Sequence, residues 1–429
     1  MGSTKNVVIL GASYGGLSTA HYLLRHVIPR LPTQETYQII LINPSREVFC
    51  RPACPRAMLS DDMFEPNRLF VNINSTQLQK HGAENLRLVW GKATDLDHNG
   101  RHVTVLQHDG TMETVSFHAL VIATGATTPS PLLGLSLDVK FLKDCWQTFR
   151  NFLSYSKRIV IAGGGPSGVE AAGELGEYLN GRAGFFTPRQ STRKAGITLI
   201  TSGRQILPDL RPSIAAKAEH YLSRLGVTLV KNARVKSVTP EGAGQDPRLL
   251  ISESVVLLED GRSFEADLFI PATGPTPNTS FIRDKSLLSA GGYIDTNPKT
   301  LRVDRAGERI YAIGDVSNYA RPAIHNILEA VPVLCANMKR DLLLAAGQND
   351  SRGQDAVFCE DTRETQFVPI GKGKGVGMAV GWQVPSFFVW LIKGRDYWLW
   401  TTEKLWSGKK WAKERGQKEL PRTKEEVIE

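Results

Sequence analysis

Short runs of apolar, β-branched residues recur along the chain, and two of them end directly at a glycine-rich turn. Val7–Leu10 leads into Gly11–Gly16, and Ile159–Ala162 leads into Gly163–Gly168. Apolar residues then recur at helical spacing, most clearly over Val169–Leu179. Continuous apolar runs are typical of strands buried on both faces, and the spacing that follows is typical of helices. The pattern therefore predicts a strand, a glycine turn and a helix, twice.

A second repeated pattern indicates an internal duplication. Ala119–Gly125 and Ala266–Gly274 each form an apolar run that ends in Ala-Thr-Gly. Each is preceded by an Asp-Gly pair, at 109–110 and at 260–261, which is a common signal for a hairpin. We therefore predict two related α/β nucleotide-binding units, the second inserted in the first. The expected division is a first unit at 1–143 and 280–340, a second unit at 144–279 and a C-terminal domain at 341–429.

The glycine turns carry the first chemical signal. Glycines let a backbone approach a pyrophosphate closely, and the helix that follows presents unpaired N–H groups and a partial positive charge. The second turn has full G-x-G-x-x-G spacing, whereas Ser13 replaces the middle glycine of the first turn. Two tandem dinucleotide sites indicate electron transfer between a tightly bound flavin dinucleotide and an exchangeable nicotinamide dinucleotide.

A third motif is Arg309–Asp315, a strand pattern that ends in Gly-Asp after the second unit. Together with the glycine turns and the Ala-Thr-Gly motifs, it makes residues 5–340 resemble the two-dinucleotide-domain flavoprotein superfamily, which includes glutathione reductase, type II NADH dehydrogenases and apoptosis-inducing factors. The resemblance implies two Rossmann-like domains, with FAD in the first, NAD(P)H in the second, and the Gly-Asp aspartate on the ribitol. The cofactor-binding residues expected on this basis are Gly11, Ser13, Tyr14, Gly15, Gly16, Asn43, Arg56, Ala123, Thr124, Gly125, Gly163, Gly165, Pro166, Ser167, Gly168, Gly274, Gly314 and Asp315.

Two positions depart from the pattern of that superfamily and bear on cofactor choice. The ribose-binding acid expected after the second strand of the first unit is Asn43, which can still bond to ribose hydroxyls. The corresponding strand of the second unit, Ile197–Thr201, is followed by Ser202 and Arg204 where the acid would stand. An acid would repel a 2′-phosphate, whereas these two residues can accept one. We therefore expect NADPH to be accepted alongside NADH; an Arg204 that faces solvent is the alternative.

The cysteines and histidines argue against disulfide chemistry and against a metal site. Cys50 and Cys54 lie near the position of the redox pair in disulfide reductases, but their C-x3-C spacing beside two prolines favours packing over a dithiol role. The segment is expected to line the flavin, with Arg56 near it. Five cysteines in 429 residues make no disulfide framework. The histidines show no paired ligand spacing, so no metal site is expected.

Charge and aromatic residues concentrate near the C-terminus. The chain has 52 Lys and Arg against 43 Asp and Glu, and most of the excess lies between residues 371 and 424. Aromatic residues interleaved with basic ones are typical of a surface at a membrane interface. We expect residues 381–424 to contact a membrane; packing on the flavin domain or a homodimer contact are the alternatives, and nucleic acid is not expected because no binding motif for it occurs. Six of the eight tryptophans lie there: Trp382, Trp390, Trp398, Trp400, Trp406 and Trp411.

The expected location follows from the same features. No run of 18 apolar residues and no leader sequence is found, so we expect a cytoplasmic protein that is peripherally associated with a membrane. The mitochondrial outer surface and lipid droplets are the candidate membranes.

The acceptor is inferred from a closer resemblance. Residues 381–396 resemble the C-terminal piece of the apoptosis-inducing-factor-homologous mitochondrion-associated oxidoreductases, whose members reduce ubiquinone and related quinones with NAD(P)H. The resemblance implies hydride transfer from NAD(P)H to FAD and transfer of two electrons to a quinone-type acceptor. A soluble flavoenzyme acting on a thiol or a specialised metabolite, and a slow-turnover redox-signalling flavoprotein, remain alternatives.

Two residues are candidate proton donors. Glu170 lies on the first turns of the second nucleotide helix. The resemblance to type II NADH dehydrogenases implies a proton-relay role for it, because the matching glutamate of those enzymes is assigned that role. His325 lies at the start of the helix after Gly314-Asp315, which is expected to point its N-terminus at the flavin. A carboxylate that interacts only with the helix dipole, and a packed histidine, are the alternatives.

Overall fold

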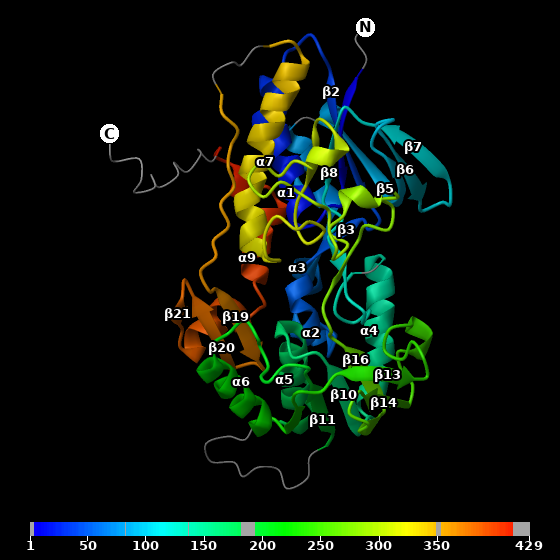
Figure 1. Cartoon of the computed structure of the whole chain (residues 1–429), viewed down its shortest axis with the longest axis vertical. Helices are drawn as coiled ribbons and strands as arrows, with labels where there is room; N and C mark the ends of the chain where they lie inside the picture. The colour runs from blue at the N-terminus through cyan, green and yellow to red at the C-terminus, as the bar shows by residue number, and fades with distance from the viewer. Residues whose placement is uncertain (1–3, 82, 136, 182–193, 349–352, 415–429) are drawn as a thin grey trace.

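The computed structural model describes residues 4–81, 83–135, 137–181, 194–348 and 353–414. Two nucleotide-binding units lie one above the other, and the C-terminal segment runs alongside both of them (Figure 1). Each unit is built on a twisted sheet with a parallel core, so the predicted α/β class with two Rossmann-like units is confirmed.

The first unit is built on a seven-stranded sheet in the order β18-β8-β1-β2-β5-β6-β7. The strands from β18 to β5 pair in parallel, whereas β5, β6 and β7 pair antiparallel, and the predicted hairpin at 109–110 joins β6 and β7. β18 adds to this sheet beside β8, so the chain returns to the first unit as predicted. The strands are β1 (Lys5–Leu10), β2 (Tyr37–Asn43), β5 (Leu86–Asp97), β6 (His102–Gln107), β7 (Met112–Ser116), β8 (Ala119–Ile122) and β18 (Ile310–Ala312).

Helices α1 (Tyr14–Tyr22) and α7 (Ile324–Ala345) pack on each other beside this sheet, where Leu17, Val331 and Leu334 are buried in one core. The burial explains the pattern from which the strands were predicted, because Val7–Leu10 of β1 is covered on both faces.

The second unit contains a parallel sheet in the order β12-β11-β10-β16 and an antiparallel sheet in the order β13-β14-β15. The predicted hairpin at 260–261 joins β14 and β15. The predicted boundary at residue 144 falls inside α4 (Val139–Leu153), whose buried side chains share a core with β10 and α5. The other elements are β10 (Arg158–Ala162), α5 (Pro166–Asn180), β11 (Gly196–Ile200), α6 (Pro212–Arg224), β12 (Val227–Val230), β13 (Val235–Thr239), β14 (Ser254–Leu258), β15 (Ser263–Ala266) and β16 (Leu268–Pro271).

Short elements connect the two units. Strands β9 (Ala126–Thr127) and β17 (Thr276–Pro277) pair antiparallel where the chain passes between the units. Strands β3 (Glu47–Phe49) and β4 (Phe70–Asn72) form a ribbon, and the short helices α2 (Cys54–Ala57) and α3 (Pro66–Leu69) lie between them in sequence.

The C-terminal segment forms a small antiparallel sheet and then turns back to the first unit (Figure 1). β19 packs on α5, and α9 packs on α1. In the described part of the chain, no helix combines the length and the apolar character needed to cross a bilayer. The elements are β19 (Gln366–Ile370), β20 (Lys374–Ala379), β21 (Trp382–Gln383), α8 (Ser386–Val389), a π-helical turn at Trp390–Gly394, α9 (Leu399–Trp406) and a 3-10 turn at Lys409–Trp411.

Candidate functional site

A cavity of about 1040 Å³ lies where the first unit, the N-terminal end of α5 and the C-terminal segment meet. This volume is at the upper end of the range of about 300–1,000 Å³ that small-molecule sites usually have. The turn between β1 and α1, the loop after β18, the start of α7, the start of α5, and residues of β19 and α9 all line it. The cavity therefore brings together the motifs that were predicted separately from the sequence.

The first glycine turn forms one wall of this cavity. Gly11 has φ +97°, and a Cβ there would lie 2.3 Å from the carbonyl oxygen of Ala123. A Cβ on Gly16 would lie 1.8 Å from the carbonyl oxygen of Gly11, so both positions need glycine for the chain itself to pack. Gly16 does not line the cavity, whereas Gly11, Ala12, Ser13, Tyr14 and Gly15 do.

The residues around this turn fit a dinucleotide. Helix α1 begins at Tyr14 directly beside the cavity, and Ser13 makes no side-chain capping bond to the helix, so its hydroxyl is available to a ligand. Asn43, at the end of β2, accepts a 2.9 Å hydrogen bond from the backbone N–H of Ala12 and also lines the cavity. The amide thus ties the turn to the next strand while it faces the place expected for ribose.

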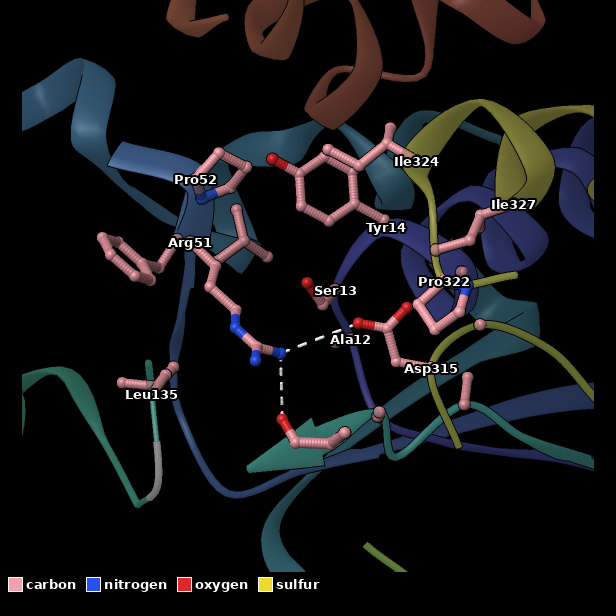
Figure 2. A pocket seen from close by; sticks show the side chains of 18 of the residues that line it. Ala12, Ser13, Tyr14, Arg51, Pro52, Leu135, Asp315, Pro322, Ile324 and Ile327 are labelled. Carbon is pink, nitrogen blue, oxygen red and sulfur yellow. Dashed lines mark hydrogen bonds and ion pairs between the residues drawn. The ribbon is translucent and has the colours of Figure 1, made fainter. Parts of the chain in front are cut away.

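The Gly-Asp motif, Gly314-Asp315, lines the same cavity as the first glycine turn. Figure 2 shows Asp315 facing Arg51 across the cavity, with Ser13 and Tyr14 of the first glycine turn beside them. Arg51 Nη1 donates to the carbonyl oxygen of Ala126 at 3.0 Å and lies 3.7 Å from Asp315 Oδ2. Burial raises the pKa of Asp315, and the Arg51 guanidinium opposes that rise. Sequence reasoning missed Arg51, although its place next to Cys50 was a usable signal.

The Ala-Thr-Gly motif of the first unit reaches the same cavity. Ala123, Thr124 and Gly125 line it, and nothing lies within 4 Å of a Cβ built on Gly125. Asn278, which directly follows β17, holds this motif through two hydrogen bonds. Its Nδ2 donates to the Thr124 carbonyl oxygen at 2.9 Å, and the Thr124 hydroxyl donates to the backbone carbonyl oxygen of Asn278 at 2.9 Å. In the second motif, Gly274 has φ +110° and open space around it, but it lies outside the cavity lining.

The start of α7 is placed as expected. Gly314 has φ +85°, and the chain then enters α7 with Ile324 and His325 lining the cavity. His325 is exposed, so it lies at the rim and is not a packed core histidine.

The second glycine turn contributes to the cavity lining only through residues at the start of α5. Pro166 and Ser167 line the cavity, whereas Gly163, Gly165 and Gly168 do not. A Cβ on Gly168 would lie 2.0 Å from the Gly163 carbonyl oxygen, so this glycine serves the packing of the turn. No atom lies within 4 Å of a Cβ on Gly165, which leaves the turn open to a ligand.

Ser202 and Arg204 are exposed in the loop that follows β11. A Cβ on Gly164 would lie 2.4 Å from Thr201 Oγ1, so this loop packs directly against the second glycine turn. Both residues are outside the lining of the large cavity, on the side where the far part of a nicotinamide dinucleotide is expected.

A buried ion pair lies in the cavity wall between α5 and the C-terminal segment. Lys393 Nζ lies 2.5 Å from Glu170 Oε1, and both side chains are buried. Burial raises the pKa of Glu170 to about 7, although the Lys393 ammonium acts to lower it. The ammonium also lies 5.0 Å from the centre of the Trp398 ring. Lys393 could not be predicted as the partner of Glu170, because the two residues are far apart along the chain.

Arg56 does not line the cavity, contrary to the expectation that it lies beside the flavin. Its guanidinium is buried and forms a two-point contact with Glu174, with distances of 3.0 Å from Nε to Oε2 and 2.7 Å from Nη2 to Oε1. The Tyr397 hydroxyl donates to Glu174 Oε1 at 3.0 Å. A charged group this deep needs full pairing, and Glu174 on α5 provides it.

Cys50 and Cys54 are buried free thiols. Burial raises the pKa of both, that of Cys50 to about 11, so the thiolate that redox exchange needs is disfavoured. The Tyr14 hydroxyl donates to Cys50 Sγ at 3.5 Å. The arrangement agrees with a packing role for both cysteines.

Part of the predicted membrane-contacting tail is packed on the first unit instead. Trp406 and Trp411 are buried, and the Trp406 ring lies 4.8 Å from that of Tyr14. His21 Nε2 lies 2.9 Å from the Trp406 carbonyl oxygen, and His26 Nε2 lies 2.7 Å from that of Trp411. For these two tryptophans the expectation of a membrane contact is wrong, because α1 and the π-helical turn Leu23–Val27 that follows it supply the ring contacts and the polar partners. Residues 415–424 of that tail lie outside the described residues.

Other apolar side chains of the C-terminal segment remain exposed. They come from β21, α8, the π-helical turn and α9, and the most exposed is Trp382 at 79%. The group, which we call the aromatic face, consists of Trp382, Phe387, Phe388, Leu391 and Trp400.

Comparison with known proteins gives relatives over almost the whole chain. The chain is 58% identical over 411 residues to oxidoreductase phnG of Penicillium herquei, which covers 96% of this chain and 98% of phnG. It is 25% identical over 405 residues to ferroptosis suppressor protein 1 of Homo sapiens, covering 93% of this chain and 95% of that protein.

Among solved structures, NDH2 from Plasmodium falciparum in complex with RYL-552 superposes with a TM-score of 0.63 at 13% identity, covering 96% of this chain and 99% of that chain. This similarity shows a shared fold. A family model described as pyridine nucleotide-disulphide oxidoreductase matches residues 5–333. The chain therefore belongs to the pyridine nucleotide-disulphide oxidoreductase family, whose members are FAD-dependent NAD(P)H oxidoreductases.

Proposed function

We propose that this protein is an NAD(P)H:quinone oxidoreductase that works at a membrane surface. The observation that carries the proposal is the single cavity in which the first glycine turn, the start of α5 and the aromatic C-terminal segment meet. FAD bound in that cavity would accept hydride from NAD(P)H and deliver an electron pair to an acceptor. The residues of this chain would bind and orient the nicotinamide donor and the acceptor, and would supply protons to the acceptor.

An apolar, planar acceptor suits the wall that the C-terminal segment contributes. Phe367, Ile392, Trp398, Trp400 and Leu405 line that part of the cavity. Flat aromatic side chains favour stacking with a flat ligand. The buried thiols at positions 50 and 54, with raised pKa values, argue against a disulfide substrate. A quinone therefore fits this wall better than a thiol compound does.

Reduction of a quinone to a hydroquinone consumes protons, and Glu170 is suited to supply one. Its pKa of about 7 means that the carboxyl group can carry a proton near neutral pH and release it. Lys393 donates to Oε1, so it orients the carboxyl group and compensates the charge that remains after transfer. His325, exposed at the rim of the cavity, is the second candidate proton donor.

The nicotinamide donor is proposed to be NADPH, with NADH also accepted. Ser202 and Arg204 are exposed beside the second glycine turn, where a 2′-phosphate would lie in this fold. The guanidinium would bind such a phosphate through paired N–H groups.

A membrane partner is proposed on the basis of the aromatic face. Its five side chains lie on a segment whose exposed lysines include Lys372, Lys374 and Lys404. Such a surface combines apolar burial with attraction to anionic headgroups of about 1 kcal/mol per basic residue. A quinone dissolved in that membrane would reach the cavity from the same side.

A second candidate is an oxidoreductase that acts in solution on a specialised small metabolite. It is favoured by the burial of Trp406 and Trp411 against α1, which removes two of the aromatic groups from any membrane contact. The two candidates share the cavity and the cofactors, and they differ in the acceptor and in the need for lipid.

Stopped-flow spectroscopy tests the proposal. The protein is reduced anaerobically with NADPH and mixed with a ubiquinone analogue in anionic vesicles, with glutathione disulfide, or with oxygen. The proposal predicts that the quinone reoxidises the protein faster than the other two acceptors do. Reoxidation by the quinone that is slower than reoxidation by oxygen would sink it and would favour the second candidate or a slow-turnover signalling role.

A further inference from the structure

Three acidic residues lie along one face of α5, the helix that begins at the second glycine turn. Glu170, Glu174 and Glu177 are spaced at helical intervals, so their side chains stack on the same side. Each receives a partner from the C-terminal segment: Lys393 Nζ bonds to Glu170, the Tyr397 hydroxyl to Glu174, and the Lys372 backbone N–H to Glu177. The C-terminal segment is thus bound along the nucleotide helix through carboxylates.

Arg56 joins this interface from a third direction. It lies on α2 in the first unit, and its side chain is 4% exposed. While Nε and Nη2 bind Glu174, Nη1 donates to the carbonyl oxygen of Gly394 at 2.7 Å and to that of Arg395 at 3.2 Å. One planar guanidinium therefore contacts both α5 and the backbone of the C-terminal segment.

The two carbonyl groups belong to the end of the π-helical turn Trp390–Gly394, which carries Lys393. The last carbonyls of a helical segment lack partners within the helix, and a cation placed there satisfies them. Arg395 N donates back to the Trp390 carbonyl at 2.7 Å, which closes the π-helical turn. π-Helical turns are rare and are often found at functional sites, where they need support from the surrounding structure. Arg56 provides that support here.

We propose that Arg56 is a positioning residue that holds Lys393 against Glu170 by tying the Trp390–Gly394 turn to α5. Arg56 does not line the cavity and touches no expected ligand, so its positioning effect on the reaction passes through Lys393, separately from the direct effect of its charge on Glu170. The catalytic consequence rests on the proposed function, in which Glu170 supplies a proton. The proposal that Arg56 ties the Trp390–Gly394 turn to α5 rests on the hydrogen bonds of its guanidinium alone.

The charged groups that face Glu170 determine what loss of this contact would do. They are Lys393 from the π-helical turn, Arg56 from α2 and Glu174 from its own helix, with the Tyr397 hydroxyl close by. Lys393 and Arg56 lower the pKa of Glu170, whereas burial and Glu174 raise it. If Lys393 moves away, the protonated form of Glu170 is favoured further and its pKa rises.

Two variants separate positioning from a direct effect of charge. Arg56→Lys keeps the positive charge but cannot make the two-point contact and the carbonyl contacts together. The double variant Arg56→Met/Glu174→Met removes two charges whose direct effects on Glu170 oppose each other, and apolar replacement of a whole buried pair is usually tolerated. The matched control is Arg302→Lys, because Arg302 makes a comparable two-point contact with Asp341 in the first unit, outside the cavity lining.

The direct readout is the infrared band of the protonated Glu170 carboxyl group, identified by its loss in Glu170→Gln and titrated with pH in each variant. We expect the titration midpoint to rise by about half a pH unit to one unit in Arg56→Lys and in the double variant, and to stay in place in Arg302→Lys. A double variant in which Glu170 titrates as in the unaltered protein overturns the proposal.

The pH profile of kcat with NADPH and a ubiquinone analogue is measured on the same variants. It is expected to shift in parallel with the infrared titration while KM for NADPH stays unchanged. If the infrared midpoint moves but Glu170→Gln leaves the pH profile of kcat unaltered, the positioning role stands and the proton step of the proposed function fails. If Glu170→Gln alters the profile but the infrared midpoint stays fixed in both Arg56 variants, the reverse holds.

Discussion

At Glu170, burial and the Lys393 ammonium act on the pKa of one carboxyl group in opposite directions, and burial prevails. A fully exposed glutamate is ionised at neutral pH and cannot donate a proton efficiently. A carboxyl group with a pKa of about 7 is populated in both states at the pH of the cell, which is the condition for general acid catalysis.

The first prediction concerns the pH dependence of this group. Because the donor must be protonated, quinone reduction should slow as the pH rises through about 7. Glu170→Gln cannot release a proton, so kcat should fall about 100-fold, within the usual range for loss of a general acid, and the limb of the pH profile near 7 should disappear. Steady-state kinetics between pH 5.5 and 9, roughly two units around that pKa, measure both effects. A Glu170→Gln variant with an unchanged pH profile would contradict the assignment.

The second prediction concerns the choice between NADPH and NADH. Arg204→Ala removes the guanidinium proposed to bind the 2′-phosphate, so KM for NADPH should rise about tenfold, corresponding to roughly 1.4 kcal/mol, while KM for NADH stays within about twofold. Arg224→Ala, an exposed arginine at the end of α6, is the matched control and should change neither value. Equal effects of Arg204→Ala on both dinucleotides would refute the proposed phosphate contact.

At the scale of elements, the packing of α9 on α1 holds the C-terminal segment over the cavity. Trp406 is buried against Tyr14 in the core that α1 and α7 form beside the first sheet. Its backbone carbonyl oxygen contacts His21 Nε2. Tyr14 itself belongs to the first glycine turn, so the anchor of the C-terminal segment and the cofactor-binding turn share a contact.

The third prediction follows from that contact. Trp406→Ala should lower the free energy of unfolding by about 3–5 kcal/mol, because a large buried ring is replaced by a cavity. Trp382→Ala, at a position that is 79% exposed, should change it by no more than about 0.5 kcal/mol. Denaturant unfolding of both variants provides the test, and similar losses of stability in the two would contradict the described packing.

Most of the fold was predicted from signals that are local along the chain. The apolar runs at β1 and β10, the glycine turns and the Asp-Gly hairpins each depend on residues within a few positions of one another, and all of them form as predicted. The cavity residues of the first glycine turn, Asn43 and Asp315 were predicted from the family resemblance that these local motifs carry.

The missed features depend on contacts between residues that are distant in the chain. Lys393 pairs with Glu170 across 223 positions, and Arg56 pairs with Glu174 across 118. No spacing in one sequence reveals such partners. Composition likewise does not predict burial, because Trp406 and Trp411 belong to the same basic, aromatic-rich segment as the exposed Trp382, yet they pack on α1.

At the scale of the whole molecule, the C-terminal segment connects two properties that the proposed function needs. Lys393 and Trp398 of this segment line the cavity, and its exposed apolar side chains form the aromatic face, of which Trp400 also lines the cavity. Under the proposed function, an acceptor dissolved in a membrane would meet cavity-lining residues and the aromatic face on the same segment of the chain.

The fourth prediction tests the aromatic face. The double variant Phe387→Ser/Phe388→Ser should weaken binding to anionic vesicles at least about tenfold, since each buried phenyl ring contributes about 1.5–3 kcal/mol. Phe152→Ser, an exposed phenylalanine on α4, is the matched control and should leave vesicle binding unchanged. Co-sedimentation with vesicles measures both variants. Unaltered binding by the double variant would exclude this face as the membrane contact.

The central claim is that one cavity holds FAD where NAD(P)H bound to the second unit can reduce it. Visible absorbance of the purified protein under anaerobic conditions tests this claim most directly. The account predicts a yellow protein with FAD bound in a one-to-one ratio, whose flavin absorbance is bleached by one equivalent of NADPH. A colourless protein that takes up no added FAD, or a yellow protein that NADPH and NADH leave oxidised, would contradict it.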